Sequence, residues 1–194
     1  MARVPVAAVA VVVLGSGGVA LADVPRSDVI DPRGSPVLFA DPLYGGPRPD
    51  ELRVLDLGGM STFTMRYLRD EGQTIILYSR AGDGEFIPTQ RTPSDLRARF
   101  IPPGGVGRSL GEGATLGAGR VYVFERYEMS LSGHAYGCFV ASSVAQDDVL
   151  VVNQCRTGPA VPEEAEVAAS LGRLRVVQPV RAPGAVALRG GKSI

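Results

Sequence analysis

The sequence predicts an α+β domain built around one antiparallel sheet of about five or six strands, accompanied by two short helices. Several segments alternate between apolar and polar residues and are joined by short turns, which is typical of antiparallel strands with one buried face. Two other segments begin with the proline and acidic residues that start helices. An all-β sandwich or barrel is the alternative.

The first predicted element of the domain is a β-hairpin. In STFTMRYLR, residues 61–69, the side chains of Phe63, Met65 and Tyr67 point to one face and polar side chains point to the other. The sequence DEG then supplies turn residues, and QTIILYS, residues 73–79, follows as a β-branched strand. We therefore expect these two segments to pair.

A short helix is predicted after this hairpin, in TPSDLRARF. Thr92 is a suitable N-cap, Pro93 suits the first helical position, and Asp95 lies near the positive end of the helix dipole. The helix is expected to be short because Pro102 and Pro103 follow it.

The remaining elements follow from composition and from helix signals. Residues 102–119 are so rich in glycine that we expect a surface loop, and RVYVFERYEMS, residues 120–130, is the next strand. A second helix is predicted in VPEEAEVAASLG, where Pro162 stands at the start, glutamates occupy the first turn and Gly172 marks the end. A last short strand is expected at residues 174–177.

Residues 133–158 contain the only histidine and both cysteines of the chain. We expect this stretch to form a β-hairpin with Gln146–Asp147 at its tip. In that register Cys138 lies directly opposite Cys155 on one face of the sheet. A non-hydrogen-bonded antiparallel pair holds its Cα atoms about 4.5 Å apart, within the reach of a disulfide. We therefore predict a Cys138–Cys155 disulfide that stabilises the fold by roughly 3 kcal/mol.

His134 is a weak candidate for catalysis or metal binding. Together with Cys138 and Cys155 it offers three ligand types that zinc prefers, and Asp147 or Asp148 offers a fourth. In an oxidising compartment, however, two cysteines form a disulfide more readily than a metal site or a thiol nucleophile. We therefore expect no catalytic residue, no metal and no cofactor, and we expect His134 to be a solvated turn residue.

The strand over residues 120–130 offers a candidate binding face, because charged side chains share one of its faces with aromatic side chains. Cross-strand charge pairing on a solvated sheet face is the simpler explanation of the same pattern. The candidate residues are Tyr122, Phe124, Arg126, Tyr127 and Glu128.

Residues 1–22 have the pattern of a secretory signal peptide. Arg3 supplies a positive charge, Val6–Leu14 is apolar, and Ala20-Leu21-Ala22 matches a cleavage site. The apolar run of about 9 residues is shorter than the roughly 20 that span a bilayer. We expect cleavage after Ala22 and a periplasmic or secreted protein that meets the membrane only during export. An uncleaved membrane anchor is the alternative.

The ends of the mature chain are expected to lie outside the domain. Residues 23–50 are rich in Pro, Gly and Asp and lack periodicity, so we expect an irregular N-terminal arm that contributes little to stability. A single globular domain is expected over residues 51–178, followed by a disordered tail over residues 179–194.

Composition and motifs narrow the range of possible functions. The 20 basic and 20 acidic residues balance, which gives no electrostatic footprint for nucleic acid. No catalytic constellation stands out in the sequence. The leading hypothesis is therefore an exported, non-enzymatic protein that binds a protein or glycan partner in the cell envelope, for example as an inhibitor of a secreted enzyme. A small secreted hydrolase is one alternative, and a membrane-tethered accessory subunit is another if the leader is retained.

Overall fold

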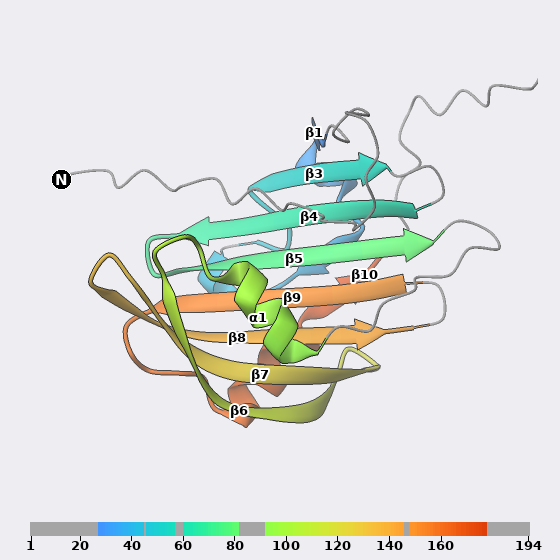
Figure 1. Cartoon of the computed structure of the whole chain (residues 1–194). Helices are drawn as coiled ribbons and strands as arrows, with labels where there is room; N and C mark the ends of the chain where they lie inside the picture. The colour runs from blue at the N-terminus through green and yellow to red at the C-terminus, as the bar shows by residue number, and fades with distance from the viewer. Residues whose placement is uncertain (1–26, 45, 57–59, 82–91, 146–147, 178–194) are drawn as a thin grey trace, which may run out of the picture.

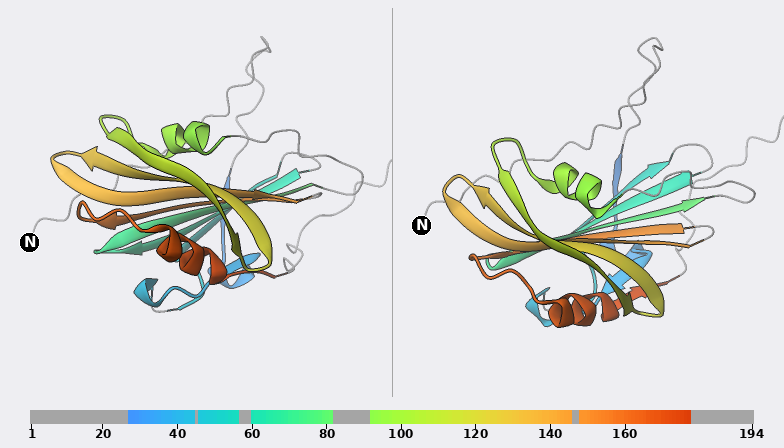
Figure 2. Two further views of the ribbon diagram at one scale, coloured as in Figure 1. Left: turned by 90° about the horizontal axis from the view of Figure 1, so that it is seen from below. Right: turned by 60° about the horizontal axis from the view of Figure 1, so that its bottom comes forward.

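The computed structural model describes residues 27–44, 46–56, 60–81, 92–145 and 148–177. Within these ranges the chain forms an eight-stranded antiparallel sheet with one helix on each face (Figures 1 and 2). The predicted class, an antiparallel sheet with two short helices, is confirmed. The described residues form ten strands instead of five or six, counting a separate two-stranded sheet. The two edge strands do not pair within these ranges, so the large sheet is open and the barrel alternative is wrong.

The strand order across the large sheet is set by antiparallel neighbours. It runs β1 (Asp28–Ile30), β3 (Glu51–Asp56), β4 (Met60–Arg69), β5 (Gly72–Ala81), β9 (Asp148–Thr157), β8 (His134–Val144), β7 (Arg120–Leu131) and β6 (Val106–Gly117). The small sheet pairs β2 (Val37–Phe39) with β10 (Leu174–Val176). The helices are α1 (Pro93–Phe100) and α2 (Glu164–Gly172), with 3-10 turns at Pro32–Gly34 and Pro42–Tyr44.

Each side of the large sheet carries its own hydrophobic core, and we name the sides the α1 face and the α2 face. On the α1 face, Leu96 of α1 packs over Tyr127, Cys138 and Cys155. Figure 2 shows α2 and the small sheet on the same side of the large sheet, and on this α2 face a larger core joins them to the central strands. The α2-face core includes Phe39, Met65, Tyr67, Ile76, Tyr122, Phe124, Phe139, Leu150, Val167, Leu171 and Leu174.

The start of the described chain belongs to this core, which differs from the irregular arm expected from the sequence. Val37, Phe39 and Tyr44 are at most 2% exposed. The Tyr44 hydroxyl is 2.8 Å from Oγ1 of Thr74 in β5, so the segment is also tied to the sheet by a buried hydrogen bond. The reason is tertiary: β2 gains its partner only when β10, far along the chain, lies beside it.

A buried polar network holds this N-terminal segment against α2. Asp41 is only 4% exposed and accepts hydrogen bonds from Arg173, at 3.1 Å, and from the Gln154 amide, at 3.5 Å. The hydroxyl of Ser170 in α2 donates to Gln154 Oε1 at 3.0 Å. Buried polar groups of this kind are tolerated because each one has a partner.

The glycine-rich segment forms a strand, so the expected surface loop over residues 102–119 is wrong for Val106–Gly117. A Cβ atom on Gly113 would lie 2.6 Å from the ring of Phe124, and one on Gly117 would lie 2.7 Å from Leu171 Cβ. Contacts this close leave no room for a side chain. The glycines therefore allow an aromatic ring and helix α2 to pack directly on the backbone of the edge strand.

Helix α1 begins where the sequence predicts, and helix α2 begins two residues after Pro162, the start expected from the sequence. Thr92 Oγ1 accepts from the backbone N–H of Asp95, and the Asp95 carboxylate accepts from the backbone N–H of Thr92, which completes a capping box. Helix α2 begins at Glu164, and the Glu163 backbone N–H donates to the Glu166 carboxylate at 2.8 Å.

Helix α1 is also tied to the sheet by a buried ion pair. The Glu125 side chain is 1% exposed, and its carboxylate lies 3.4 Å from the guanidinium of Arg97 in α1. A buried carboxylate needs such a partner, because removing a charge from water is costly.

Burial of tyrosines predicts a loss of stability at alkaline pH. Burial raises the pKa of Tyr122 from 10.0 to about 12, and burial likewise raises the pKa of Tyr44, Tyr67, Tyr78 and Tyr127. The unfolded chain therefore ionises at lower pH than the folded chain. The stabilisation that comes from keeping Tyr122 neutral in the folded chain is fully present below pH 10.0. It is lost as the pH rises from 10.0 towards about 12.

The check is urea unfolding over this pH range. Tyr122→Phe is the matched control, because within the described residues the Tyr122 hydroxyl has no hydrogen-bond partner. The variant should be as stable as the wild type at neutral pH and should lose less stability at high pH. If Tyr122→Phe lost as much stability at high pH as the wild type, ionisation of Tyr122 would not be a cause of the loss.

Four sequence predictions concern residues outside the described ranges: the signal peptide, residues 23–26 of the arm, the hairpin tip at Gln146–Asp147, and the tail over residues 179–194. Among the residues described, no helix has both the length and the apolar character needed to cross a membrane.

Candidate functional site

The predicted disulfide links β8 to β9 in the predicted register. Cys138 pairs with Cys155, Val140 with Asn153, and the Cα atoms of the two cysteines are 4.1 Å apart. This short separation is typical of a non-hydrogen-bonded antiparallel pair. Neither cysteine is free, so the disulfide prediction is confirmed.

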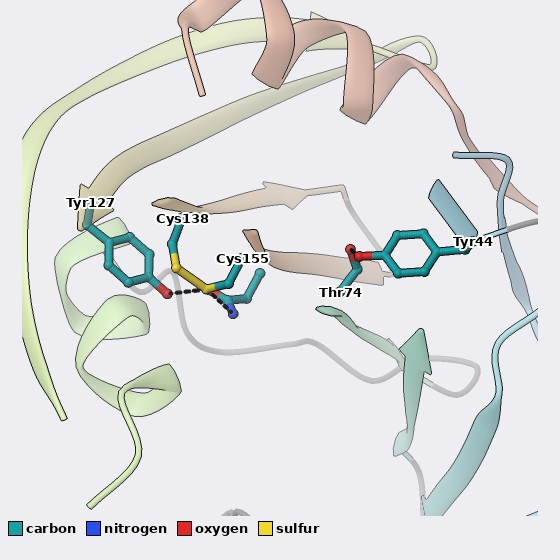
Figure 3. The surroundings of a disulfide bond; sticks show 6 residues. Tyr44, Thr74, Tyr127, Cys138 and Cys155 are labelled. Carbon is teal, nitrogen blue, oxygen red and sulfur yellow. Dashed lines mark hydrogen bonds between the residues drawn. A yellow bond between two sulfur atoms is a disulfide. The ribbon is translucent and has the colours of Figure 1, made fainter. Parts of the chain in front are cut away.

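The disulfide lies in the interior, beneath helix α1 (Figure 3). Cys138 is 0% exposed and Cys155 is 4% exposed. The Tyr127 hydroxyl donates to Asn153 Oδ1 at 2.6 Å beside the bridge, and burial raises the pKa of this tyrosine. A buried bridge with neutral neighbours acts as a structural clamp and offers no thiolate for catalysis.

His134 is exposed at the start of β8, directly after a tight turn. Ser132 and Gly133 both have positive φ, 52° and 79°, as a two-residue hairpin turn requires. Cys138 lies four positions after His134 along the strand, a rise of about 13 Å. His134 is therefore not placed to act with the cysteines. Within the described ranges, no cluster of three or more His, Cys, Asp or Glu side chains is arranged to hold a metal ion.

The predicted binding face does not form an exposed surface. Tyr122, Phe124 and Tyr127 are at most 1% exposed. The first two lie in the α2-face core, and Tyr127 lies under α1 on the opposite face. Alternation along β7 is as the sequence predicts, but both faces of the strand are covered where these aromatic residues lie.

The two charged residues of that predicted face are engaged in ion pairs. Arg126 lies 3.5 Å from the carboxylate of Glu163, next to the start of α2. Glu128 lies 2.7 Å from Arg108 across the β6–β7 ladder. The Glu128–Arg108 contact is the cross-strand pairing of the simpler explanation, whereas Arg126 pairs with the start of a helix.

A shallow open depression lies at the other end of β6 from the turn. Its volume of about 180 Å³ is small beside the roughly 300 Å³ or more of small-molecule sites. The lining residues are Val106, Arg108, Glu128, Met129, Ser130, Ala135 and Pro159. The size of this depression therefore gives no support for a small-molecule substrate site at this place.

A more distinctive surface lies on the α1 face, beyond the part that helix α1 covers. Leu116 and Val121 face each other across the β6–β7 ladder and are 68% and 67% exposed. Val123 and Val144 share this face and are each 45% exposed. We call these four residues the aliphatic patch. It spans three neighbouring strands and contains no charged side chain.

The physical origin of the patch is the short length of α1. The helix covers the α1 face at Glu125, Tyr127 and Met129, which are at most 7% exposed. The same face of β7 continues through Val123 and Val121, where exposure rises to 45% and 67%. Single exposed apolar residues are common, whereas a group on adjacent strands is a candidate interaction surface.

A polar cluster lies near the patch on the opposite side of the sheet. Arg120 and Asp148 form an ion pair, and the hydrogen bond with Asp148 raises the pKa of Arg120. The Tyr78 hydroxyl donates to the same carboxylate at 3.4 Å, and Arg120 donates to Ser143 Oγ at 3.3 Å. The cluster connects the ends of β5, β7, β8 and β9. It therefore holds in place the strands that carry the patch.

The fold and the site together describe an α+β protein with an internal disulfide and an exposed aliphatic patch on an open sheet. No family model and no curated protein matches the chain. Among solved structures, it is similar to the solution structure of cyanobacterial PsbP (CyanoP) from Synechocystis sp. PCC 6803, with a TM-score of 0.39. The two are 10% identical, and the alignment covers 83% of this chain and 98% of that chain. A likeness at this level carries no argument about function.

Proposed function

We propose that this chain is an exported, non-enzymatic protein that binds a protein partner through the aliphatic patch. The observation that carries the proposal is the exposure of Leu116 and Val121, 68% and 67%, side by side on an ordered sheet. Exposed aliphatic area on a soluble surface is unfavourable unless another surface covers it. The patch is the surface that such a partner would cover.

The chemistry of the patch favours a protein over a glycan. Its four members are Leu or Val, and they offer neither an aromatic platform nor a hydrogen-bonding side chain. A flat aliphatic strip on a sheet complements another aliphatic strip, as in the packing of one sheet on another. A secreted enzyme that the protein inhibits would be one partner of this kind.

Export is supported by the disulfide and by the leader. A buried disulfide forms and persists in oxidising compartments, whereas thiols in the cytosol are kept reduced. The pattern of residues 1–22 fits secretion with removal of the leader. The hydrolase alternative relied on His134 or a carboxylate. His134 lies at an exposed hairpin end, so the structure offers this residue no pocket in which to act, and we favour the binding function.

Leader cleavage gives a direct test of the export proposal. We expect the protein recovered from the periplasm or the medium to begin at Asp23, because the Ala20-Leu21-Ala22 box precedes that residue. Mass spectrometry of the intact protein checks this. Recovery of chain that still begins at Met1 from the membrane fraction would support a retained anchor instead.

The binding proposal is tested by comparing affinity capture with three forms of the mature protein. Val121→Asp should lose the captured partner, because a carboxylate within the contact would be buried without a counter-charge. Val29→Asp is the matched control, because Val29 is 65% exposed but lies on β1 at the opposite edge of the sheet. A partner that Val121→Asp retains at wild-type yield would contradict the proposal.

A further inference from the structure

We propose that two copies of this chain form a two-fold symmetric dimer by pairing their β6 strands antiparallel over residues 113–117. The dimer uses the edge of the sheet, whereas the proposed partner binding uses its face. The inference therefore goes beyond the proposed function and stands on different observations.

The two edges of the large sheet differ in length. Strand β1 has only 3 residues, whereas β6 has 12, and no strand of the described ranges pairs with the outer side of β6 (Figure 1). Short edge strands resist further pairing, and long ones invite it unless they are protected. The edge at β6 is therefore the one that a further strand would join.

Only the first half of β6 has the features that usually prevent an edge strand from pairing with another strand. Its first half contains a bulge between Ser109 and Gly111, with charged residues on either side, Arg108 and Glu112. Bulges and charges discourage edge pairing. Residues 113–117, Gly-Ala-Thr-Leu-Gly, contain no charge, no proline and no bulge. A pairing segment of about five residues remains open.

The hairpin geometry fixes which backbone groups point outwards. The β6–β7 turn consists of Ala118 and Gly119, with φ of 50° and 77°, so Gly117 and Arg120 form the hydrogen-bonded pair that closes it. Alternation then directs the backbone of Thr115 towards β7. The N–H and C=O groups of Ala114 and Leu116 point to the open side.

These outward groups are self-complementary in one register. When Thr115 lies on the two-fold axis, the backbone of Ala114 meets that of the partner subunit's Leu116, and the reverse contact is identical. Directly opposed residues share a face, so a small side chain lies opposite a large one on the α1 face. Shifting the axis to Ala114 would instead place the Glu112 carboxylate opposite Leu116. The axis at Thr115 is therefore the favoured arrangement.

The charges of helix α2 fit the same symmetry. The helix packs beneath β6, since Gly117 lies against Leu171. Glu164 and Glu166 lie in its first turn, and Arg173 follows its last residue. A two-fold axis through β6 makes the two α2 helices antiparallel, so the acidic start of each lies on the side of the basic end of the other. Glu164 and Arg173 pair with Arg126 and Asp41 within their own copy, but both side chains remain partly exposed, so their charges still favour a second copy over an unrelated strand.

The test is sedimentation equilibrium of the mature protein at concentrations up to the millimolar range. We expect a monomer–dimer equilibrium with a dissociation constant of about 100 µM, because a short ladder gives a small interface. Ala114→Pro should raise this constant at least about tenfold, since it removes an outward N–H that the monomer does not use. Ala114→Ser keeps the N–H and is the matched control, and circular dichroism verifies that both variants remain folded.

A second variant tests the register. In the proposed dimer, Thr115 faces its own copy in a non-hydrogen-bonded pair, about 4.5 Å between Cα atoms. Thr115→Cys should therefore form a covalent dimer on mild oxidation. Leu116→Cys should not, because it faces the partner subunit's Ala114. A protein that stays monomeric at millimolar concentration, or a dimer that persists unchanged in Ala114→Pro, would overturn the proposal.

Discussion

Replacing Phe39 by alanine is expected to lower the free energy of unfolding by about 3 to 5 kcal/mol. The side chain is 0% exposed, and its ring centroid lies 5.5 Å from that of Tyr67 and 5.9 Å from that of Tyr44. Its backbone pairs with Leu174 in the small sheet. The truncation would open a cavity where the N-terminal segment, the large sheet and β10 meet. Urea unfolding followed by circular dichroism measures the loss.

Leu38→Ala is the matched control for this prediction. Leu38 is the next residue of β2, but it is only partly buried and is not a member of the α2-face core. We expect a clearly smaller loss from this variant. A Phe39→Ala loss below about 1 kcal/mol would indicate that residues 37–44 are dispensable, as the irregular arm expected from the sequence would be.

Replacing both cysteines by alanine is expected to remove about 3 kcal/mol of stability. The bridge closes a loop with a sequence separation of 17, and its removal enlarges the unfolded ensemble. The bridge also contributes to the core under α1, so part of the loss comes from packing. Reduction of the wild-type protein in urea should shift the unfolding midpoint in the same direction.

Val144→Ala is the matched control for the disulfide. It lies on β8, on the same face as Cys138, but is 45% exposed, so its truncation should cost well under about 1 kcal/mol. Two free thiols in protein isolated from the oxidising compartment would contradict the clamp. Equal stability of the double alanine variant and the wild type would contradict its energetic role.

The elements that the sequence predicts correctly are those specified by local signals. The β8–β9 register follows from two cysteines placed symmetrically about a turn, and the start of α1 follows from Thr92, Pro93 and Asp95. The β4–β5 hairpin follows from period-two alternation on both sides of a short turn. In each case the deciding residues are close together in the chain.

Strand β6 could not be predicted from the sequence, because the residues that favour a strand there lie elsewhere in the chain. Glycine disfavours strands by its own propensity. Here Gly113 makes room for the Phe124 ring, and Gly117 makes room for Leu171. The burial of Phe39 was missed for a similar reason, because its partners lie in β4 and β10. Tertiary contacts decide both cases.

The predicted binding face was misplaced because alternation does not say which face a helix will cover. Along β7 the aromatic residues Tyr122 and Phe124 alternate with Val121 and Val123. The predicted binding face included the aromatic side of this strand. In the structure the larger aromatic side chains are buried against α2, and the valines remain exposed. Only the lengths and positions of the two helices resolve this choice.

Site-specific photo-crosslinking in intact exporting cells tests the binding proposal most directly. A photoreactive phenylalanine analogue at position 121 lies within the aliphatic patch, and the same residue at position 29 lies at the opposite edge of the sheet. We expect a discrete adduct with a different protein from position 121 and none from position 29. Failure of position 121 to yield any adduct other than cross-linked copies of this chain, or identical adducts from both positions, would contradict partner binding through the patch.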